Sequence, residues 1–150
     1  MKRILVGVDA SQHSLDALRQ AVEEARLRGG TLEVLYAFEP PDSTTAFPIL
    51  PEMGENHADV EVMRQHANDQ LGAWLDETGV DLSDLEVTWT VVPDRKPSRA
   101  LIERSADADL VVVGSRGRGG FAGLRLGSVS EQVTRHAQCP VLVVRRRSSS

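Results

Sequence analysis

Two short runs of uninterrupted apolar residues constrain the fold of this chain more than any other feature. They occupy residues 4–8 and 110–113 of the 150 residues. A strand that keeps one face in water alternates apolar and polar side chains, whereas a strand covered on both faces is apolar throughout. We therefore expect both runs to be central strands of a parallel sheet that has helices on each side.

Helix and strand patterns alternate along the rest of the chain. Apolar residues at helical spacing follow Ser11, Val60, Pro97 and Gly127, and strand patterns occupy residues 31–38, 85–91 and 141–144. The strand at 85–91 alternates apolar and polar residues, which is typical of a sheet edge. This order requires right-handed crossovers into a mostly parallel sheet. The predicted fold class is therefore α/β, a single doubly wound five-stranded parallel sheet with helices on both faces.

The domain is expected to span residues 1–144. A basic, Ser-rich segment over residues 145–150 follows it and is expected to be a frayed terminus. Prolines concentrate at positions 40, 41, 48 and 51, which predicts a loop between the second strand and the second helix.

Charge and cysteine content exclude several classes of protein. The formal net charge is -5, unlike the positive field that holds nucleic acids or anionic membranes. No stretch approaches the roughly 20 apolar residues of a membrane span, and the N-terminal run is too short for a signal peptide. Cys139 is the only cysteine, so an internal disulfide is impossible, and we expect it to be an inert packed residue. We expect a cytoplasmic protein that binds neither nucleic acid nor membrane.

Two loops are candidates for a binding site. Ligands of doubly wound sheets bind beyond the carboxyl ends of the central strands, where the connections diverge to opposite faces. The loop after the first strand begins with Gly7, Val8 and Asp9, and the loop after the fourth strand runs from Gly114 to Gly127. The two loops are expected to lie side by side.

The second of these loops has the composition of a phosphate site. Glycine permits positive φ angles and the close approach of an anion to backbone N–H groups. Gly127 and Ser128 also open a predicted helix, whose positive N-terminus favours an anion. Positive charges at Arg116, Arg118 and Arg125 oppose the negative charge of the chain as a whole. Arg125 is equally consistent with simple solvent exposure.

Other nucleotide motifs are absent from the sequence. A Walker A loop needs G-x-x-x-x-G-K-[ST], but the only lysines are Lys2 and Lys96. The dinucleotide fingerprint G-x-G-x-x-G does not follow the first strand either, which disfavours NAD. Asp9 at the end of that strand can accept hydrogen bonds from a ribose or an adenine amino group. It can also cap the following helix jointly with Ser11, and the two roles are compatible.

The glycine spacing resembles that of the universal stress protein family, whose ATP-binding branch has G-x2-G-x9-G-[ST] between the fourth strand and the last helix. Gly114, Gly117, Gly127 and Ser128 match this motif without a gap. The resemblance covers nearly the whole chain and implies a Rossmann-like fold of the adenine nucleotide α-hydrolase type. It also implies an ATP-binding stress-response protein that acts as a homodimer. The expected cofactor is ATP, with or without Mg2+.

The resemblance further implies roles for individual residues. Asp9 matches an aspartate that contacts the nucleoside, Ala37 and Val113 match residues near the adenine, and Gly7 and Val129 flank the ligand. The turn at residues 93–97 departs from the family pattern, since it is more charged than the small-residue turn common there.

Enzymatic activity is left open by the sequence. The four histidines show no metal-ligand spacing, and neither a dedicated base nor an arginine finger is identified, so no catalytic residue and no metal site are assigned. A slow ATPase remains an alternative, as does an adenylating enzyme, although residues 9–14 lack the S-G-G-x-D-S loop of such enzymes. A nucleotide-independent interaction domain is the third alternative, against which the intact glycine motif argues.

The last strand predicts self-association. Residues 141–144 are uniformly apolar, yet a terminal strand in this topology lies at a sheet edge, and a bare apolar edge invites pairing. A symmetric dimer in which this strand meets its copy would cover the edge. Coverage by a helix or by the tail is the alternative.

Overall fold

The computed structural model describes residues 1–38, 57–115 and 126–145. The elements in chain order are β1 (Arg3–Val8), α1 (Gln12–Arg28), β2 (Thr31–Phe38), α2 (His57–Thr78), β3 (Val87–Pro93), α3 (Pro97–Ser105), β4 (Leu110–Gly114), α4 (Ser128–His136) and β5 (Val141–Val144). The proline-rich loop, most of the C-terminal tail, and the predicted site residues Arg116, Gly117, Arg118 and Arg125 lie outside the described residues.

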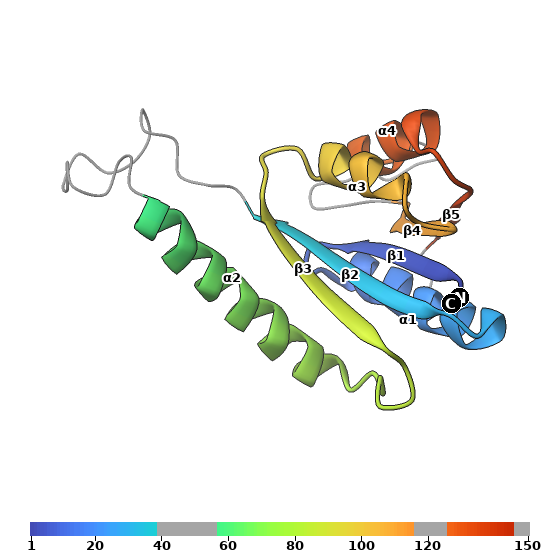
Figure 1. The fold of residues 1–150 in the computed structure, drawn as a ribbon, viewed down its shortest axis with the longest axis horizontal. Coiled ribbons are helices and arrows are strands. Elements are labelled where there is room, and N and C mark those ends of the chain that lie inside the picture. The colour runs from blue at the N-terminus through green and yellow to red at the C-terminus, as the bar shows by residue number, and fades with distance from the viewer. Residues whose placement is uncertain (39–56, 116–125, 146–150) are drawn as a thin grey trace.

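The five strands form one parallel sheet in the order β3-β2-β1-β4-β5 (Figure 1). From β1 the chain moves outward through β2 to β3, then crosses to β4 and ends at β5 on the other side. The order therefore reverses between β1 and β4, which is the switch point of a doubly wound sheet. This arrangement confirms the predicted fold class, and it places the alternating strand β3 at an edge, as predicted.

Helices cover both faces of the sheet, α1 and α2 on one side and α3 and α4 on the other (Figure 1). Successive side chains of a strand point to opposite faces. Ile4 and Val6 of β1 accordingly belong to the core beneath α1, and Leu5 belongs to the core beneath α3. Because both faces are dry, β1 and β4 need apolar residues at every position, which explains the two uninterrupted runs.

Side-chain and backbone signals set the limits of α1. Ser11 is the N-cap, its Oγ accepts a hydrogen bond from Ser14 N at 3.2 Å, and Ser14 Oγ accepts one from Ser11 N at 3.0 Å. This reciprocal pair satisfies amides that would otherwise lack a partner at the helix start. At the other end Gly29 adopts the left-handed conformation, with φ of 62°, which glycine accepts without steric cost. The predicted start and stop of this helix are confirmed.

The largest difference from the predicted strands is at the start of β3. The alternating pattern predicts a strand from Leu85, but the strand starts at Val87. Leu85 lies in a turn, and its N–H donates to Leu82 O at 3.1 Å. Arg26 of α1 holds this turn, because its guanidinium donates to both carboxylate oxygens of Asp84 at 2.9 Å and to Asp81 O at 2.8 Å. Local bonds from Ser83 N and Ser83 Oγ to Asp81 Oδ1 also hold the turn, so both local and distant contacts stabilise it in place of the first predicted strand residues.

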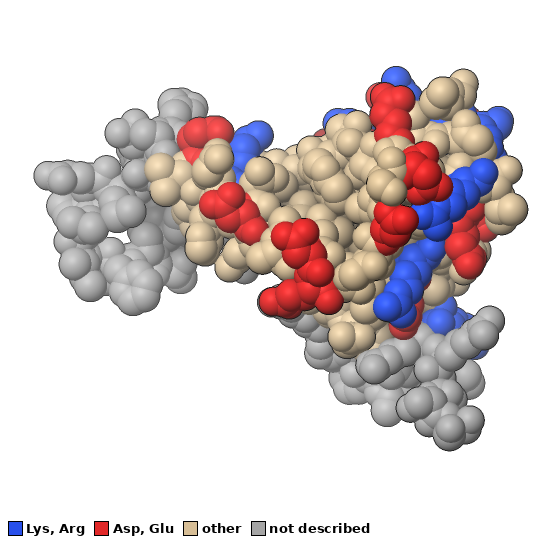
Figure 2. Space-filling view, turned by 90° about the horizontal axis from the view of Figure 1, so that it is seen from below, with Lys and Arg blue, Asp and Glu red and all other residues tan. Residues whose placement is uncertain are grey.

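The surface on the α1 and α2 side carries charges of both signs. Figure 2 shows acidic side chains spaced along the α2 half and acidic and basic side chains mixed over the α1 half. Exposed residues of α2 include Glu61, Asp69, Asp76 and Glu77. In the part of the chain that the structure describes, no helix is long and apolar enough to cross a membrane.

Candidate functional site

The switch point lies between the carboxyl ends of β1 and β4. The register pairs Val6 with Val112, and each strand runs on for two residues past this pair, to Val8 and Gly114 respectively. On the other side of β1, Val8 pairs with Tyr36, so that Ala37 follows at the level of Asp9. Three neighbouring strands thus bring the predicted residues at their ends to one edge of the sheet.

Hydrogen bonds around Ser115 join the two ends of the glycine motif. Gly127 N donates to Ser115 O at 2.7 Å, which places the start of α4 directly against the end of β4. Ser130 Oγ lies 3.2 Å from Ser115 O and 3.0 Å from Gly127 O, and Ser115 N donates to Val144 O at 2.8 Å. Gly114 and Gly127, which the sequence separates, are therefore held close together at the switch point.

The N-terminus of α4 faces this edge without a side-chain cap. Gly127 is the N-cap residue, with φ of -65°, and as a glycine it has no side chain that could accept from the first amides of the helix. The first amides of a helix have no intrahelical partner, and they carry the positive end of the helix dipole. Ser128 and Val129 supply such amides here. The Ser128 side chain is exposed, so its hydroxyl is accessible as a further donor.

Asp9 contributes to the turn that leads into α1. Its Oδ1 accepts a hydrogen bond from Ser11 N at 3.0 Å, while Ser11 itself is the N-cap. Asp9 therefore has the capping role that the sequence offered as one of its two roles, and it shares this role with Ser11. The turn also holds Ala10 at φ of 63°, a left-handed conformation that costs a non-glycine residue roughly 1–2 kcal/mol. The sequence gives no sign of this strained position, because alanine is not a residue that favours it.

The apolar residues predicted near the ligand are largely part of the two cores. Val8 is buried on the α1 side of the sheet, and Val113 is 2% exposed on the α3 side. Ala37 and Val129 are partly buried against the same core as Val113. A ligand at this edge of the sheet would therefore contact Val8 and Val113 mainly through their backbone atoms, and Ala37 and Val129 through their remaining exposed surface.

The charged turn after β3 forms part of the rim at this edge. Asp94 N donates to Phe38 O at 2.9 Å and thereby joins the ends of β2 and β3. The Asp94 carboxylate receives two hydrogen bonds from Arg99, at 2.8 and 3.1 Å, and one from Lys96 N at 2.9 Å. The Arg99 guanidinium holds the pKa of the Asp94 carboxyl below its usual range. The turn that departs from the family pattern therefore ties β3 to the start of α3.

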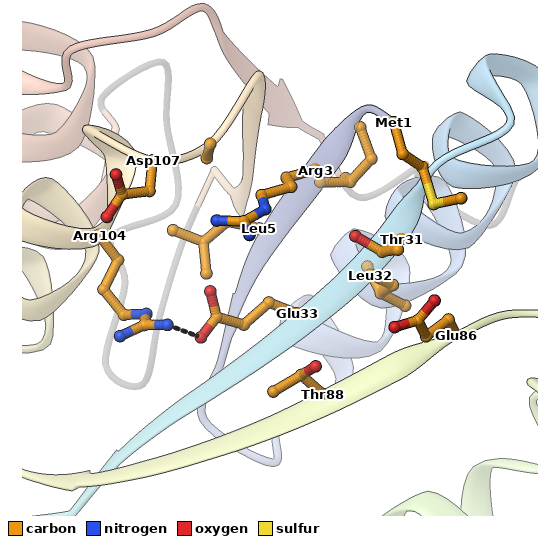
Figure 3. Close-up of a pocket in the computed structure, with 12 residues that line it drawn as sticks. Met1, Arg3, Leu5, Thr31, Leu32, Glu33, Glu86, Thr88, Arg104 and Asp107 are labelled. Carbon is orange, nitrogen blue, oxygen red and sulfur yellow. Dashed lines mark ion pairs between the residues drawn. The ribbon is translucent and has the colours of Figure 1, made fainter.

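A cavity of about 470 Å³ lies at the opposite, amino edge of the sheet (Figure 3). Arg3, Glu33 and Arg104 border it, and Arg104 Nη2 pairs with Glu33 Oε2 at 2.6 Å. None of the residues predicted from the sequence to bind a ligand lines this cavity. It is therefore separate from the candidate site at the switch point.

The described ranges contain no group of three or more His, Cys, Asp or Glu residues arranged to hold a metal ion.

The sequence did not indicate Ser115 or Ser130 as site residues, although the structure places both at the base of the glycine motif. A serine in the first turn of a helix is the only signal that Ser130 leaves in the sequence, and it does not identify the carbonyl that the hydroxyl contacts.

A doubly wound parallel sheet with a glycine-bounded helix N-terminus at its switch point defines an α/β protein with a nucleotide-binding fold. The sequence profile of the universal stress protein family matches residues 1–145. The chain belongs to the universal stress protein family.

Individual relatives agree with this assignment. Universal stress protein Rv2623 of Mycobacterium tuberculosis is 38% identical over 146 residues, which are 95% of this chain and 44% of the relative. The chain spans about half the length of the curated relatives that it matches. Among solved structures, the universal stress protein UspA from Lactobacillus plantarum matches with a TM-score of 0.67 and 26% identity, over 96% of this chain and 97% of its own. A universal stress protein in complex with cAMP matches with a TM-score of 0.60 and 27% identity, over 97% and 98%.

Proposed function

We propose that this chain is an ATP-binding stress-response protein and that the nucleotide phosphates bind at the N-terminus of α4. The observation that carries the proposal is the 2.7 Å hydrogen bond from Gly127 N to Ser115 O, which holds both ends of the glycine motif at the switch point. The amides of Ser128 and Val129, which no side chain in the described ranges caps, are suitable donors for phosphate oxygens. This donor set fits a polyphosphate.

The nucleoside is proposed to lie along the ends of β1 and β2. Asp9 supplies a carboxylate for the ribose, and Ala37, Val113 and Val129 supply small apolar surfaces beside the adenine. The relative crystallised with cAMP supports an adenine nucleotide as the ligand class. Gly7 and Val8 are proposed to form the adjoining wall through their backbone.

Charge neutralisation is proposed to come from two sources. Arg116 and Arg118, with Gly117 between them, follow Ser115 directly in the sequence and would add positive charge near the phosphates. Mg2+ would enter with the triphosphate and would be held through the phosphate oxygens. No hydrolytic role is assigned to any residue.

Thermal unfolding with and without Mg-ATP tests the proposal. A ligand at about 100 times its Kd adds roughly 2.7 kcal/mol of stability, which corresponds to about 5–10 °C for a domain of this size. A shift with ATP that weakens with AMP supports binding through the phosphates. The absence of a shift in folded protein free of co-purified nucleotide would favour the nucleotide-independent interaction domain.

The variant Gly127→Asp separates binding from folding. Aspartate is a favourable N-cap residue, so the variant should be at least as stable as the unmodified protein in the absence of nucleotide. Its carboxylate would occupy the free amides and repel phosphate, so the shift with Mg-ATP should be lost. Gly127→Asn is the matched control, since it caps the helix without a charge and should retain more of the shift. Equal shifts in all three proteins would overturn the assignment to α4.

We also propose that the protein is a cytoplasmic homodimer that associates through β5. All four residues of Val141–Val144 are only partly buried, although all are apolar. Two copies of this chain amount to about the length of the curated relatives, which supports a paired arrangement. Sedimentation equilibrium should give twice the chain mass, and Val143→Lys should shift the protein toward monomer. A monomer at all concentrations would contradict the proposal.

A further inference from the structure

We infer that Ser130 is a positioning residue that sets the geometry of the phosphate site without touching the ligand. The inference rests on the proposed function, because it concerns the same helix N-terminus. Ser130 is 2% exposed, and its Oγ lies between two carbonyl oxygens, 3.2 Å from Ser115 O and 3.0 Å from Gly127 O. One of these carbonyls belongs to Ser115, the first residue after β4, and the other belongs to the N-cap of α4.

The contact with Ser115 distinguishes Ser130 from an ordinary helical serine. Serine in a helix often donates to the carbonyl three or four residues earlier, as Ser130 does to Gly127. The contact to Ser115 O spans fifteen positions and connects α4 to the segment that follows β4. Ser115 O also accepts from Gly127 N at 2.7 Å, and the Ser130 hydroxyl shares its one proton between Ser115 O and Gly127 O.

Ser115 extends this docking to the edge of the sheet. Its N–H donates to Val144 O at 2.8 Å, at the end of β5. The backbone of Ser115 therefore connects the first turn of α4 to the ends of β4 and β5. The direction of the amides of Ser128 and Val129 depends in turn on that first turn. Removal of the Ser130 hydroxyl would leave Ser115 O with one donor and a gap beside the helix.

Burial separates Ser130 from the ligand itself. Ser128 is exposed at the same helix end, whereas Ser130 lies beneath it among buried groups. An effect of Ser130 on binding must therefore pass through the placement of the amides. Because these amides are proposed to contact phosphate, the effect should fall on the phosphate part of the ligand and leave the nucleoside part unchanged.

The chain contains a matched control in Ser105. This serine is fully buried at the end of α3. Its Oγ donates to Ile102 O at 2.5 Å and accepts from Gln138 N at 2.9 Å. Ser105 thus resembles Ser130 in burial, in its bond to an earlier carbonyl of its own helix and in its bond to a distant backbone group. It lies at the end of α3 that precedes β4, away from the glycine motif.

The experiment compares Ser130→Ala and Ser105→Ala by calorimetric titration with Mg-ATP and with adenosine, at a temperature where both variants are folded. Ser130→Ala should weaken ATP binding about tenfold, since one docking hydrogen bond is lost, and should change adenosine binding by less than about twofold. Ser105→Ala should leave both affinities unchanged. Ser130→Thr keeps the hydroxyl and should restore most of the ATP affinity.

Amide hydrogen exchange of Gly127 gives a second readout that needs no ligand. The Gly127 amide should exchange faster in Ser130→Ala than in Ser105→Ala, because Ser130 contacts the first turn of α4, whereas Ser105 bonds to Gln138 beyond the opposite end of that helix. Unchanged ATP affinity in Ser130→Ala, or an equal loss for ATP and adenosine, would overturn the inference while the proposed function stands. Failure of the unmodified protein to bind ATP would overturn both.

Discussion

Gly7 of β1 lies directly against Leu101 of α3. A Cβ atom added at Gly7 would be 2.7 Å from Leu101 Cδ1, closer than real Cβ contacts, and 3.1 Å from Leu101 Cδ2, which is tighter than most of them. Leu101 is 1% exposed, so its side chain is confined on all sides by the core. Glycine at this position therefore has a packing reason, and the predicted role of Gly7 beside a ligand stays a prediction.

Gly7→Ala should destabilise the protein by about 1–3 kcal/mol, the usual cost of an extra group in a packed core. Urea unfolding measures this as a lower midpoint with an unchanged slope. Gly72→Ala is the control, because a Cβ at Gly72 of α2 meets nothing within 4 Å. There alanine should stabilise the helix by roughly 0.5–1 kcal/mol. Equal effects of the two substitutions would show that Leu101 moves aside without cost.

The fold was predictable because its main determinant is local in the sequence. Burial on both faces leaves an uninterrupted apolar run, and β1 and β4 show it because each has a strand on both sides and helices above and below. The helix signals at Ser11 and Gly29 are also local, since the cap groups lie within a few residues of each other. The start of β3 was missed because residues 81–85 form a turn, which local bonds from Ser83 to Asp81 and the distant side chain of Arg26 hold together.

The site was predictable only in part, for the same physical reason. Glycine spacing identifies the ends of the motif, and the topology rule places them at the switch point. The bonds of Ser115 to Gly127, Ser130 and Val144 join three elements, so no pattern along the sequence reports them. The left-handed conformation of Ala10 is imposed by the surrounding turn, and alanine as a residue type does not favour it.

Ser11→Ala should destabilise the protein by about 1 kcal/mol, because the N-cap side chain of α1 would be lost. Ser14 Oγ can still accept from the backbone N–H of residue 11, so half of the reciprocal pair survives and the helix should persist. Thermal unfolding followed by circular dichroism measures the loss. Ser11→Asn restores an N-cap acceptor and should recover most of the stability, and a full loss in that variant would count against capping as the cause.

Stability should depend on pH through Asp94 and Arg99. The Arg99 guanidinium lowers the pKa of Asp94 in the folded protein, whereas the unfolded value is about 3.9. The folded state therefore binds fewer protons at this group. The stabilisation is present above the unfolded pKa and is lost as the pH falls through the lower, folded pKa.

Asp94→Asn isolates this contribution. The difference in urea midpoint between the unmodified protein and the variant should be largest near pH 6 and should shrink steadily below about pH 4. Asp76→Asn, on the exposed side of α2, serves as the control for other effects of replacing a carboxylate. A difference for Asp94→Asn that stays constant down to pH 2 would show that the bond to Arg99 does not depend on the carboxylate charge.

Cys139 should react slowly with thiol reagents. Burial raises the pKa of its thiol, and the negative charge of Asp109 raises it further. The thiolate is the reactive form, so its fraction near pH 8 should be below that of an unperturbed cysteine. The rate with a disulfide reagent at pH 8 should be lower than that of glutathione and should rise when urea unfolds the protein. A folded-state rate equal to the unfolded rate would mean that Cys139 is accessible. The variant Cys139→Ser is the control and should give no signal, which would confirm that the reaction reports this residue alone.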